Sequence, residues 1–557
     1  MSIFMILNKL LLISFLISLS SCQKQKTIDN EYDVLIIGAG IGGLSAAAML
    51  SSVYGLKVAV FEAHYRAGGV AHSFPIKSST GYNYMFDAGP SIILGCSHEP
   101  YNPLKQVLDF VGADCKWIPW TEWGMLTPEQ GKWSFKLGEG HFEETLLKFG
   151  GVGAVDEFKE LRQACIPLTS GASSIPTKAL RGDKYKILPL LPYFNALQKV
   201  IPYADVLDGS FEPFMTKYVK DKFLRSWLDA LAFSLSGLPA TKTGAAAMAY
   251  TIYDLHRNGA TMDYPQGGVG KIAEVLCDVI ESTGSHVHLS KRVSKICIEN
   301  NRAAGIQLSD KTYVKAKRGI INNANIWSLS SLLADDQHKL TEEQRKYLIT
   351  DSSSKEYTKS FLHLHLGLDT TGLDLSKMKA HYTVMDQGLT NVDPCLDRNM
   401  VAVSNPSLLD NTLITAPDGS YADNKILIHA YGAGNENYDI WSNLSRDEYE
   451  KKKSTDSEYL YRSVSRALDI PIDEIKKRSD VALIGTPLTH ERFNRRYKGT
   501  YGASWGSMIA SPETPLTSLY LAGDSCFPGI GVPAVALSGA IACNTMINPL
   551  RHISKIL

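Results

Sequence analysis

Short apolar runs and longer periodic stretches alternate along the chain. Tyr32–Ile37 is an apolar run typical of a strand that is buried on both faces. Residues 102–255 instead show helical periodicity and many aromatic side chains, so we expect a mostly helical insertion there. Apolar or alternating runs at 360–368, 399–404 and 425–431 predict the strands of a further sheet. This order predicts an α/β chain in which one unit interrupts another.

A glycine-rich turn joins the first strand to a helix of small residues. The sequence GAGIGGLSAAAML follows that strand, and Gly38, Gly40 and Gly43 fit G-x-G-x-x-G. A second strand, Lys57–Phe61, ends in Glu62, at the distance from the glycines at which an acid reaches a ribose hydroxyl. The glycines permit a tight turn and a close backbone approach, so the helix N-terminus can face a pyrophosphate. Together these elements predict a dinucleotide site.

A second half of the same site is predicted near the C-terminus, in LYLAGDSCFPGIGVPAVALSGA. Leu519–Ala522 is a short apolar strand that ends in Gly523 and Asp524, and the carboxylate can accept hydrogen bonds from a sugar or ribityl hydroxyl. The helix that follows has Pro533 in its first turn, next to Val532, and continues with very small side chains. We expect this thin helix to let a flat cofactor come close, with its first amides at a polar cofactor edge.

The middle of the chain returns once to the α/β pattern. YPQGGVGKIAEVLCDVIESTGSHVHLSKRVSKI predicts a glycine turn, an amphipathic helix and a strand that ends near Val293. KAKRGIINNANIW predicts a buried strand with a polar end at Asn322 and Asn323. These segments therefore belong with the first glycine-rich turn.

Two other patterns predict no site. His363 and His365 share one strand face, but no third ligand accompanies them, so we interpret them as inward-facing residues of a sheet and predict no metal. AYGAGNEN follows a strand but lacks the third glycine and the later acid of a nucleotide fingerprint. With a single complete fingerprint, we expect no NAD(P)H as a stoichiometric substrate.

Length, charge and cysteine content limit the kinds of partner and site that we expect. A chain of 557 residues exceeds what one hydrophobic core usually supports. Lys plus Arg and Asp plus Glu both total 57, so no overall field attracts nucleic acid, and none is expected as a partner. The nine cysteines show neither C-x-x-C spacing nor a Cys/His cluster, which signals neither a zinc site nor a disulfide scaffold.

The N-terminal segment at 1–22 is typical of a signal peptide. One Lys precedes an apolar stretch at 10–19 that is too short for a good spanning helix, so we expect entry into the secretory or export pathway. Leu19-Ser20-Ser21-Cys22 also suits a bacterial lipoprotein site that would lipidate Cys22. In a photosynthetic eukaryote the destination would be the plastid. The Lys-flanked apolar stretch at 184–203 is either a peripheral membrane-docking surface or an internal core helix.

The segment after Glu62 resembles one superfamily. EAHYRAGGVAHSF contains Arg66, Gly68 and Gly69 and resembles the flavin-dependent amine oxidase and phytoene desaturase superfamily, in which an R-x-G-G loop follows the ribose-binding acid. GDSCFPGIGVPAVALSGA is similar to the C-terminal flavin motif of carotenoid isomerases and related desaturases. GTPLTHERFNRRYKGTYGASWG is similar to the same group, and the resemblance spans residues 32–548.

The resemblance implies a Rossmann-type FAD-binding domain with an interleaved substrate domain, made of a mixed sheet and the helical insertion. The discontinuous FAD-binding domain is expected at 32–101, 263–330 and 480–548. The substrate-binding, membrane-facing domain is expected at 102–262 and 331–479.

The resemblance also implies which residues hold FAD. A backbone group near Val293 meets the adenine, and the segment Gly499–Gly502 lies against the isoalloxazine. The implied FAD-binding residues are Gly38, Gly40, Gly43, Glu62, Arg66, Gly68, Gly69, Val293, Gly523, Asp524, Val532 and Pro533.

The substrate implied by the resemblance is a long, apolar, conjugated polyene taken from a membrane surface. Carotenoid cis–trans isomerisation is the expected reaction, and desaturation by hydride transfer to the flavin, with quinone or oxygen as electron acceptor, is the alternative. An amine oxidase would need an aromatic cage, which the sequence does not locate. The fold also resembles that of escort proteins of prenylated GTPases, which do not use flavin, but the complete set of flavin loops argues against such a role. No acid–base residue is assigned, and the candidates are His490, Glu491, Arg492, Arg495 and Tyr501.

Overall fold

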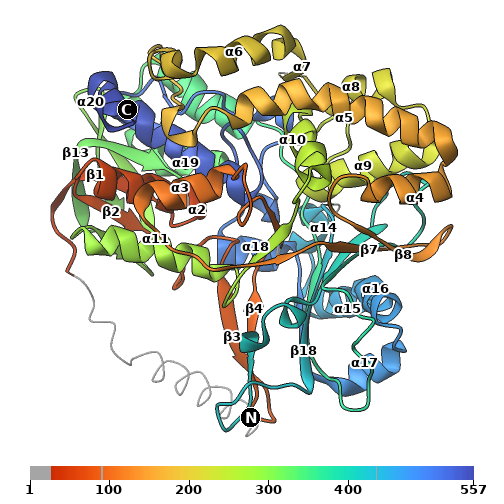
Figure 1. Cartoon of the computed structure of the whole chain (residues 1–557). Helices are drawn as coiled ribbons and strands as arrows, with labels where there is room; N and C mark the ends of the chain where they lie inside the picture. Colours follow the sequence, from red (N-terminus) through yellow and green to blue (C-terminus); the bar gives the residue numbers. More distant parts are fainter. Residues whose placement is uncertain (1–26, 90–91, 208, 435, 557) are drawn as a thin grey trace, which may run out of the picture.

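Two seven-stranded sheets form the frame of the molecule (Figure 1). The structure is a computed structural model that describes residues 27–89, 92–207, 209–434 and 436–556. The predicted signal at 1–22 lies outside the described residues.

The first sheet has the strand order β10-β2-β1-β13-β12-β11, with β20 paired to β13. Its central pairs are parallel, and β1 and β2 are almost fully buried because helices cover both faces. The apolar runs that predicted β1, β2 and β20 are therefore confirmed as strands. The bounds are β1 Glu31–Ile37, β2 Val58–Phe61, β10 His286–His288, β11 Val293–Glu299, β12 Arg302–Leu308, β13 Tyr313–Asn322 and β20 Leu519–Leu521.

One strand of this sheet differs from the prediction. Val293 begins β11 and does not end the preceding strand, because β10 stops at His288. Ser290 adopts a positive φ of 55°, which turns the chain between the two strands. β11 then pairs antiparallel with β12, so it continues the sheet on its far side from β10.

The second sheet has the order β19-β14-β18-β16-β15-β7-β8. The predicted strands at 360–368, 399–404 and 425–431 are confirmed as β14, β16 and β18. Leucines and other apolar residues of one face pack on helix α16, Glu458–Leu468, whereas histidines and tyrosines occupy the other face. The bounds are β7 Glu122–Thr127, β8 Gly131–Lys136, β14 His363–Asp369, β15 His381–Met385, β16 Met400–Ser404, β18 Lys425–Gly432 and β19 Ser479–Gly485.

The prediction of a mostly helical insertion at 102–255 is wrong for residues 117–136. These residues form strand β6, Trp117–Trp120, together with β7 and β8. In β8 the buried Trp133 and Phe135 alternate with exposed neighbours, which is the period of a strand. The predicted boundary at 480 is also wrong, because β19 pairs with β14 in the second sheet.

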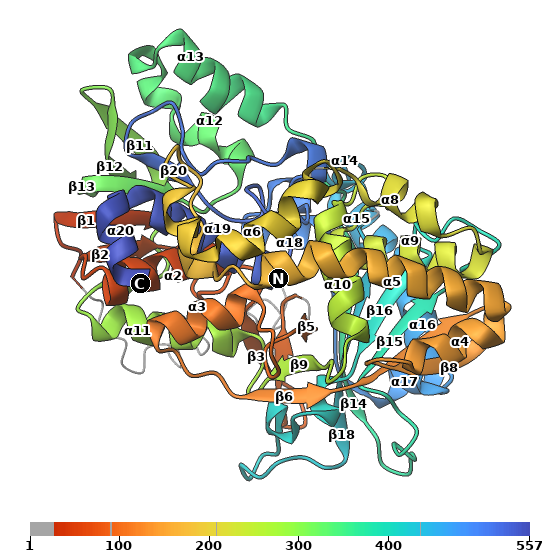
Figure 2. The same ribbon diagram turned by 45° about the horizontal axis from the view of Figure 1, so that its top comes forward.

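Helices cover each sheet separately (Figure 2). On the first sheet lie α2, α3, α11 and α19, and beside the second lie α5, α9 and α10. Among the described residues, no helix has the length and apolar character needed to cross a bilayer. The bounds are α2 Ile41–Ala48, α3 Pro103–Val111, α5 Gly151–Ser173, α9 Lys222–Ser236, α10 Ala245–His256, α11 Gly270–Ser282 and α19 Val532–Met546.

Candidate active site

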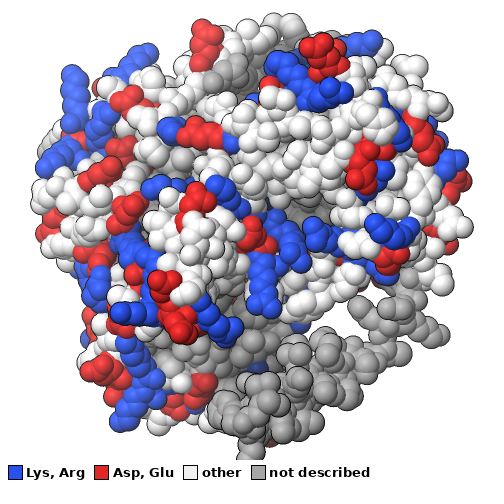
Figure 3. Space-filling view, turned by 180° about the vertical axis from the view of Figure 1, so that it is seen from behind, with Lys and Arg blue, Asp and Glu red and all other residues white. Residues whose placement is uncertain are grey.

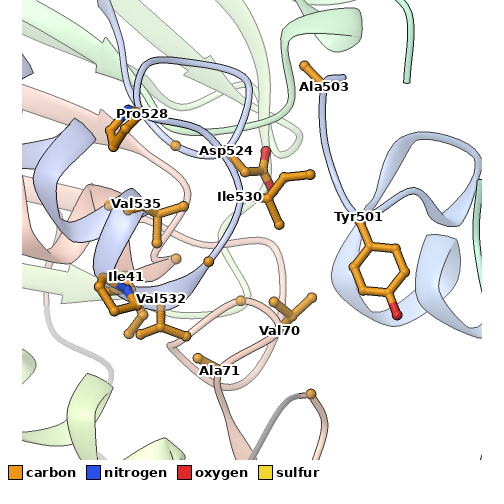
Figure 4. Close-up of a pocket in the computed structure, with 18 of the residues that line it drawn as sticks. Ile41, Val70, Ala71, Tyr501, Ala503, Asp524, Pro528, Ile530, Val532 and Val535 are labelled. Carbon is orange, nitrogen blue, oxygen red and sulfur yellow. The ribbon is translucent and has the colours of Figure 1, made fainter. Parts of the chain in front are cut away.

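A cavity of about 1390 Å³ is lined by residues of both sheets and of helices α9 and α10. Single small-molecule sites typically measure roughly 300–1,000 Å³, so this cavity has room for more than one ligand. Figure 4 shows its part beside the first sheet, where Val70 and Tyr501 lie on opposite sides of open space.

The glycine turn forms the cavity wall at the carboxyl end of β1. Gly38 and Gly40 line the cavity, whereas Gly43 lies behind them. A Cβ on Gly43 would lie only 2.3 Å from the Gly38 carbonyl oxygen, so this glycine is required for helix α2 to pack on β1. The first amides of α2 have no partner within the helix and lie at the wall. The turn therefore fits a phosphate group.

Glu62 stands beside this turn, at the end of β2, and lines the cavity. Its Oε2 accepts a hydrogen bond from the Ala39 amide and its Oε1 from the His64 amide, both at 2.8 Å. Burial raises the pKa of this carboxyl, and the two amides partly oppose that effect. A carboxylate has further lone pairs, so Glu62 can still accept from a ribose hydroxyl.

The predicted R-x-G-G loop lies next to Glu62. Arg66, Gly68 and Gly69 line the cavity, and so does Val293 at the start of β11. The Gly68 amide donates to the Ala39 carbonyl at 2.7 Å, which fixes the loop against the glycine turn. The structure thus brings the predicted cofactor residues of the N-terminal half together.

The C-terminal half of the predicted site closes the same wall. Gly523 and Asp524 follow β20 and line the cavity together with Val532 and Pro533 at the start of α19. The interpretation that the small residues of this helix face the cofactor is only partly right. A Cβ on Gly539 would lie 2.0 Å from the Gly42 carbonyl oxygen, so the middle of α19 is thin because it packs on α2.

Asp524 forms an ion pair with Arg496, a residue that the sequence did not suggest. Arg496 Nε also donates to the Thr500 carbonyl at 2.7 Å, and its other nitrogen donates to the Tyr501 carbonyl. Arg496 therefore ties the segment before Tyr501 to the C-terminal flavin motif. An acid–base candidate from the sequence is its neighbour Arg495. That residue ends helix α18, Pro487–Asn494, with a φ of 52°. Arg495 lines the cavity, and its positive charge opposes the rise that burial causes in the pKa of Glu62.

The remaining acid–base candidates fall into two groups. Glu491, Arg492 and Tyr501 line the cavity, and Glu491 accepts a hydrogen bond of 2.6 Å from the Tyr438 hydroxyl. His490 does not line it. This imidazole lies behind Phe361, with ring centroids 4.1 Å apart, and burial lowers its pKa well below the ordinary value.

Tyr501 and Phe361 form an aromatic wall next to Asp524. Their rings are stacked with centroids 4.7 Å apart, and burial raises the pKa of the Tyr501 hydroxyl. Both rings line the cavity. The tyrosine is therefore a neutral phenol at neutral pH, and the wall is apolar in character.

The polar face of the second sheet is the cavity floor. Tyr431 on β18 lies opposite His363 on β14 and opposite Ala402 on β16. His381 on β15 follows, and then Trp123 on β7. Neighbouring strands lie about 4.8 Å apart, so the floor from β14 to β7 crosses about 19 Å. All these residues except His363 line the cavity.

A hydrogen-bond network holds Tyr431 in the floor. Its hydroxyl donates to the Asp87 carbonyl at 2.9 Å, and His365 Nε2 lies 3.0 Å from both oxygens. Because a carbonyl only accepts, we assign the proton of His365 to Nε2. The prediction that His363 and His365 are inward-facing sheet residues is confirmed. No group of three or more metal-binding side chains occurs in the part of the chain that the structure describes.

Sequence analysis did not identify Arg496 or the floor residues. The sequence signal for the floor is the alternation in HLHLGL, ILIHAYG and HYTVM, where polar residues recur at every second position of otherwise apolar strands. That pattern places the side chains on one face but does not show which face borders a cavity.

Comparison with known proteins identifies the family. The family model described as flavin containing amine oxidoreductase matches residues 41–547. The chain belongs to this family. Its fold is similar to that of a solved putrescine oxidase variant, which superposes with a TM-score of 0.58 and 17% identity, over 93% of this chain and 98% of the other.

Two curated relatives of this flavin amine oxidoreductase are named for reactions on carotenoids. The chain is 29% identical to the chloroplastic prolycopene isomerase of Daucus carota, over 92% of this chain and 80% of the relative. It is 24% identical to a 4,4'-diapophytoene desaturase (4,4'-diapolycopene-forming) of Methylomonas sp, over 92% of this chain and 94% of the relative. The resemblance inferred from the motifs is therefore confirmed.

The residues at the wall fit the flavin of this family. Arg66 Nε and Asn323 Oδ1 are buried polar atoms with no hydrogen-bond partner among the described residues, and both residues line the cavity. A cofactor with phosphate and hydroxyl groups would supply the missing partners. The chain is thus a flavin-dependent oxidoreductase by family.

Proposed function

We propose that this flavoenzyme binds FAD and isomerises double bonds of a long, carotenoid-like polyene. The observation that carries the proposal is the floor, which extends from the Phe361–Tyr501 wall across the second sheet to Trp123. A flat, rigid polyene fits an aromatic-lined channel of this length, whereas a small amine would leave most of it empty. The names of the relatives support the same substrate class.

FAD would supply electrons to the polyene or accept them at its isoalloxazine ring. Glu62 would bind the adenosine ribose, the backbone near Val293 the adenine, and the first turn of α2 the pyrophosphate. Asp524, held by Arg496, and the first turn of α19 would bind the ribityl chain and the ring. Tyr501 and Phe361 would hold the polyene at the ring and exclude water.

The test is anaerobic incubation with matched cis and trans polyenes, followed by product chromatography. If the enzyme is an isomerase, chemical reduction of the flavin switches activity on, and substrate turns over many times without consuming reductant. If desaturation is the reaction instead, oxidised flavin bleaches stoichiometrically when substrate is added, and quinone or oxygen restores it. Peroxide release with simple amines and no response to any polyene would refute both reactions.

FAD binding is tested separately from catalysis. Glu62→Gln keeps the size of the side chain but removes the charged acceptor, for which a hydrogen bond is worth about 1.5–3 kcal/mol. We expect roughly tenfold or greater loss of FAD affinity, measured by reconstitution of the apoprotein. Asp33→Asn, which changes a partly exposed acid near the start of β1 that does not line the cavity, is the control. Equal affinity for wild type and Glu62→Gln would show that this acid only ends the strand.

We further propose that the substrate reaches the cavity from a membrane surface. The segment 184–203 exposes Ile187, Leu191, Phe194 and Ile201 to between 53% and 63%. Leu180, shortly before this segment, and Val200, within it, line the cavity. Lys plus Arg and Asp plus Glu both total 57, and the face in Figure 3 carries charges of both signs, so apolar contact rather than a broad electrostatic field would drive docking.

Vesicle flotation of a chain lacking residues 1–22 tests this surface without the predicted signal. The double variant Leu191→Glu, Phe194→Glu should remain soluble, while wild type floats with neutral and anionic vesicles. The control is Leu147→Glu, Val152→Glu, which adds the same charge to exposed apolar residues on α4, His141–Phe149, and α5. Export of the chain stays a prediction from its N-terminal sequence.

A further inference from the structure

A histidine and a serine form a polar pair in the floor of the cavity. His381 on β15 and Ser404 on β16 are directly opposite each other, and both line the cavity. His381 Nδ1 lies 2.9 Å from Ser404 Oγ. Around them the floor is apolar, with the ring of Trp123 5.4 Å from the imidazole centroid.

This pair always offers one donor and one acceptor to the cavity. If the serine hydroxyl donates to Nδ1, the histidine carries its proton on Nε2 and the serine oxygen can accept. If Nδ1 donates to the serine, Nε2 is the acceptor and the serine hydroxyl is the donor. No hydrogen bond of Nε2 occurs among the residues that the structure describes. Burial lowers the pKa of His381 to about 3, so the ring is neutral at physiological pH.

A hydroxyl group is the ligand function that matches one donor and one acceptor. A carbonyl can only accept, and a hydrocarbon leaves both protein groups unpaired in an apolar surrounding, which is costly. Trp123 does not compete, because its indole N–H donates to the Thr383 hydroxyl at 3.0 Å.

The position of the pair sets where the hydroxyl lies on the ligand. β15 is two strands from β18, which carries Tyr431, and this crosses about 10 Å. Tyr431 pairs with Ala402 whereas His381 pairs with Ser404, so an offset of about 7 Å along the strands brings the separation to about 12 Å. We propose that the polyene of this enzyme bears a hydroxyl group, bound by His381 and Ser404, with His381 about 12 Å from Tyr431. This inference rests on the proposed function, since it specifies the end group of the same substrate.

The experiment compares two ligands that differ only at one end. A linear conjugated polyene hydrocarbon and the same chain with a terminal hydroxyl are titrated in detergent into FAD-loaded enzyme, and flavin absorbance reports Kd. We expect wild type to prefer the alcohol by about three- to tenfold, the worth of one neutral hydrogen bond. His381→Leu should abolish that preference. His381→Gln, whose amide keeps a polar atom near Nε2, should retain part of it.

Ser404→Ala provides a second measurement, because a His381 variant could fail to fold and lose flavin. It should also reduce the preference for the alcohol, whereas Ser234→Ala, at another lining hydroxyl, should not. Equal wild-type affinity for both ligands, or a preference that survives both His381→Leu and Ser404→Ala, would overturn this inference and leave the proposed function intact. Failure of wild type to bind either polyene would overturn both.

Discussion

The two sheets contribute to the cavity in different ways. The first sheet presents backbone at Gly38, Gly40 and the first turn of α2, whereas the second presents the side chains of Tyr431, His381 and Ser404. Where backbone makes the wall, glycine is required by a positive φ, as at Gly38, or by lack of room for a Cβ, as at Gly42, so the sequence carries a fixed pattern. Where side chains make the floor, the sheet fixes only which face they share. Substitutions in the second sheet can therefore change the substrate part of the cavity without altering the cofactor part.

The largest difference between the sheets should appear in acid. Burial lowers the pKa of His363 to about 4, from about 6.5 in the unfolded chain. Between these values the unfolded chain binds more protons, so the free energy of unfolding falls as the pH drops from about 6.5 to about 4, by about 3 kcal/mol for this residue. His381 and His429, each lowered to about 3, add to the same slope. The central strands β1, β2, β13 and β20 of the first sheet contain no histidine.

Urea unfolding at several pH values measures this slope. His363→Asn removes one titrating group and should flatten it, and His338→Asn, at an exposed position, should not. A slope that is unchanged by His363→Asn would mean that the second sheet is no more acid-sensitive than the first.

A single methyl group on the first sheet should have the next largest effect. Gly43→Ala places a Cβ 2.3 Å from the Gly38 carbonyl oxygen, and overpacking of this kind costs about 1–3 kcal/mol. We expect lower thermal stability and reduced flavin retention, measured by differential scanning fluorimetry and by absorbance after gel filtration. Gly153→Ala on α5 meets no atom within 4 Å and should be neutral or stabilising. Equal behaviour of the two variants would show that the turn can widen.

The ion pair of Arg496 should have an effect of similar or smaller size. Arg496→Gln leaves Asp524 without its charged partner, and hydrogen bonds to charged groups are worth about 1.5–3 kcal/mol. Flavin fluorescence and retention should change because the Tyr501 segment loses its tie to the C-terminal motif. The matched control is Arg495→Gln, one residue away and without that ion pair. If both variants behave alike, the cluster acts only through its net charge.

The smallest effect is expected for one hydroxyl of the floor. Tyr431→Phe removes hydrogen bonds to the Asp87 carbonyl and His365 but keeps the ring, which should cost about 0.5–1.5 kcal/mol. His365 Nε2–H still donates to the carbonyl, so no polar atom is stranded. Thermal unfolding of this variant is compared with Tyr421→Phe, which is 54% exposed and should be unchanged. A loss much larger than this range would give the hydroxyl a wider role in holding β18 against the chain at Asp87.

The sequence predicted the first sheet and its wall well, because glycine, acid and strand must occur in one order for the chain to turn. It predicted the strands of the second sheet from their apolar runs, but not β7 and β8, which lie inside a stretch that is otherwise helical. Arg496 could not be distinguished from Arg495, because which side chain reaches Asp524 depends on the left-handed turn at Arg495. The floor depends on pairing between strands far apart in sequence, such as His381 with Ser404 and Tyr431 with Ala402.

Helix α19 connects the cavity wall with the chain just before the exposed apolar segment at 184–203. Its first turn lines the cavity, and near its end Asn544 Nδ2 donates to the carbonyls of Lys178 and Leu180, just before the exposed apolar segment. Thermodynamic linkage makes any coupling through this helix reciprocal. If cofactor binding stiffens α19 and so favours docking at a lipid surface, that surface must tighten cofactor binding by the same factor. The helix would then allow the enzyme to keep its cofactor best where its substrate is dissolved.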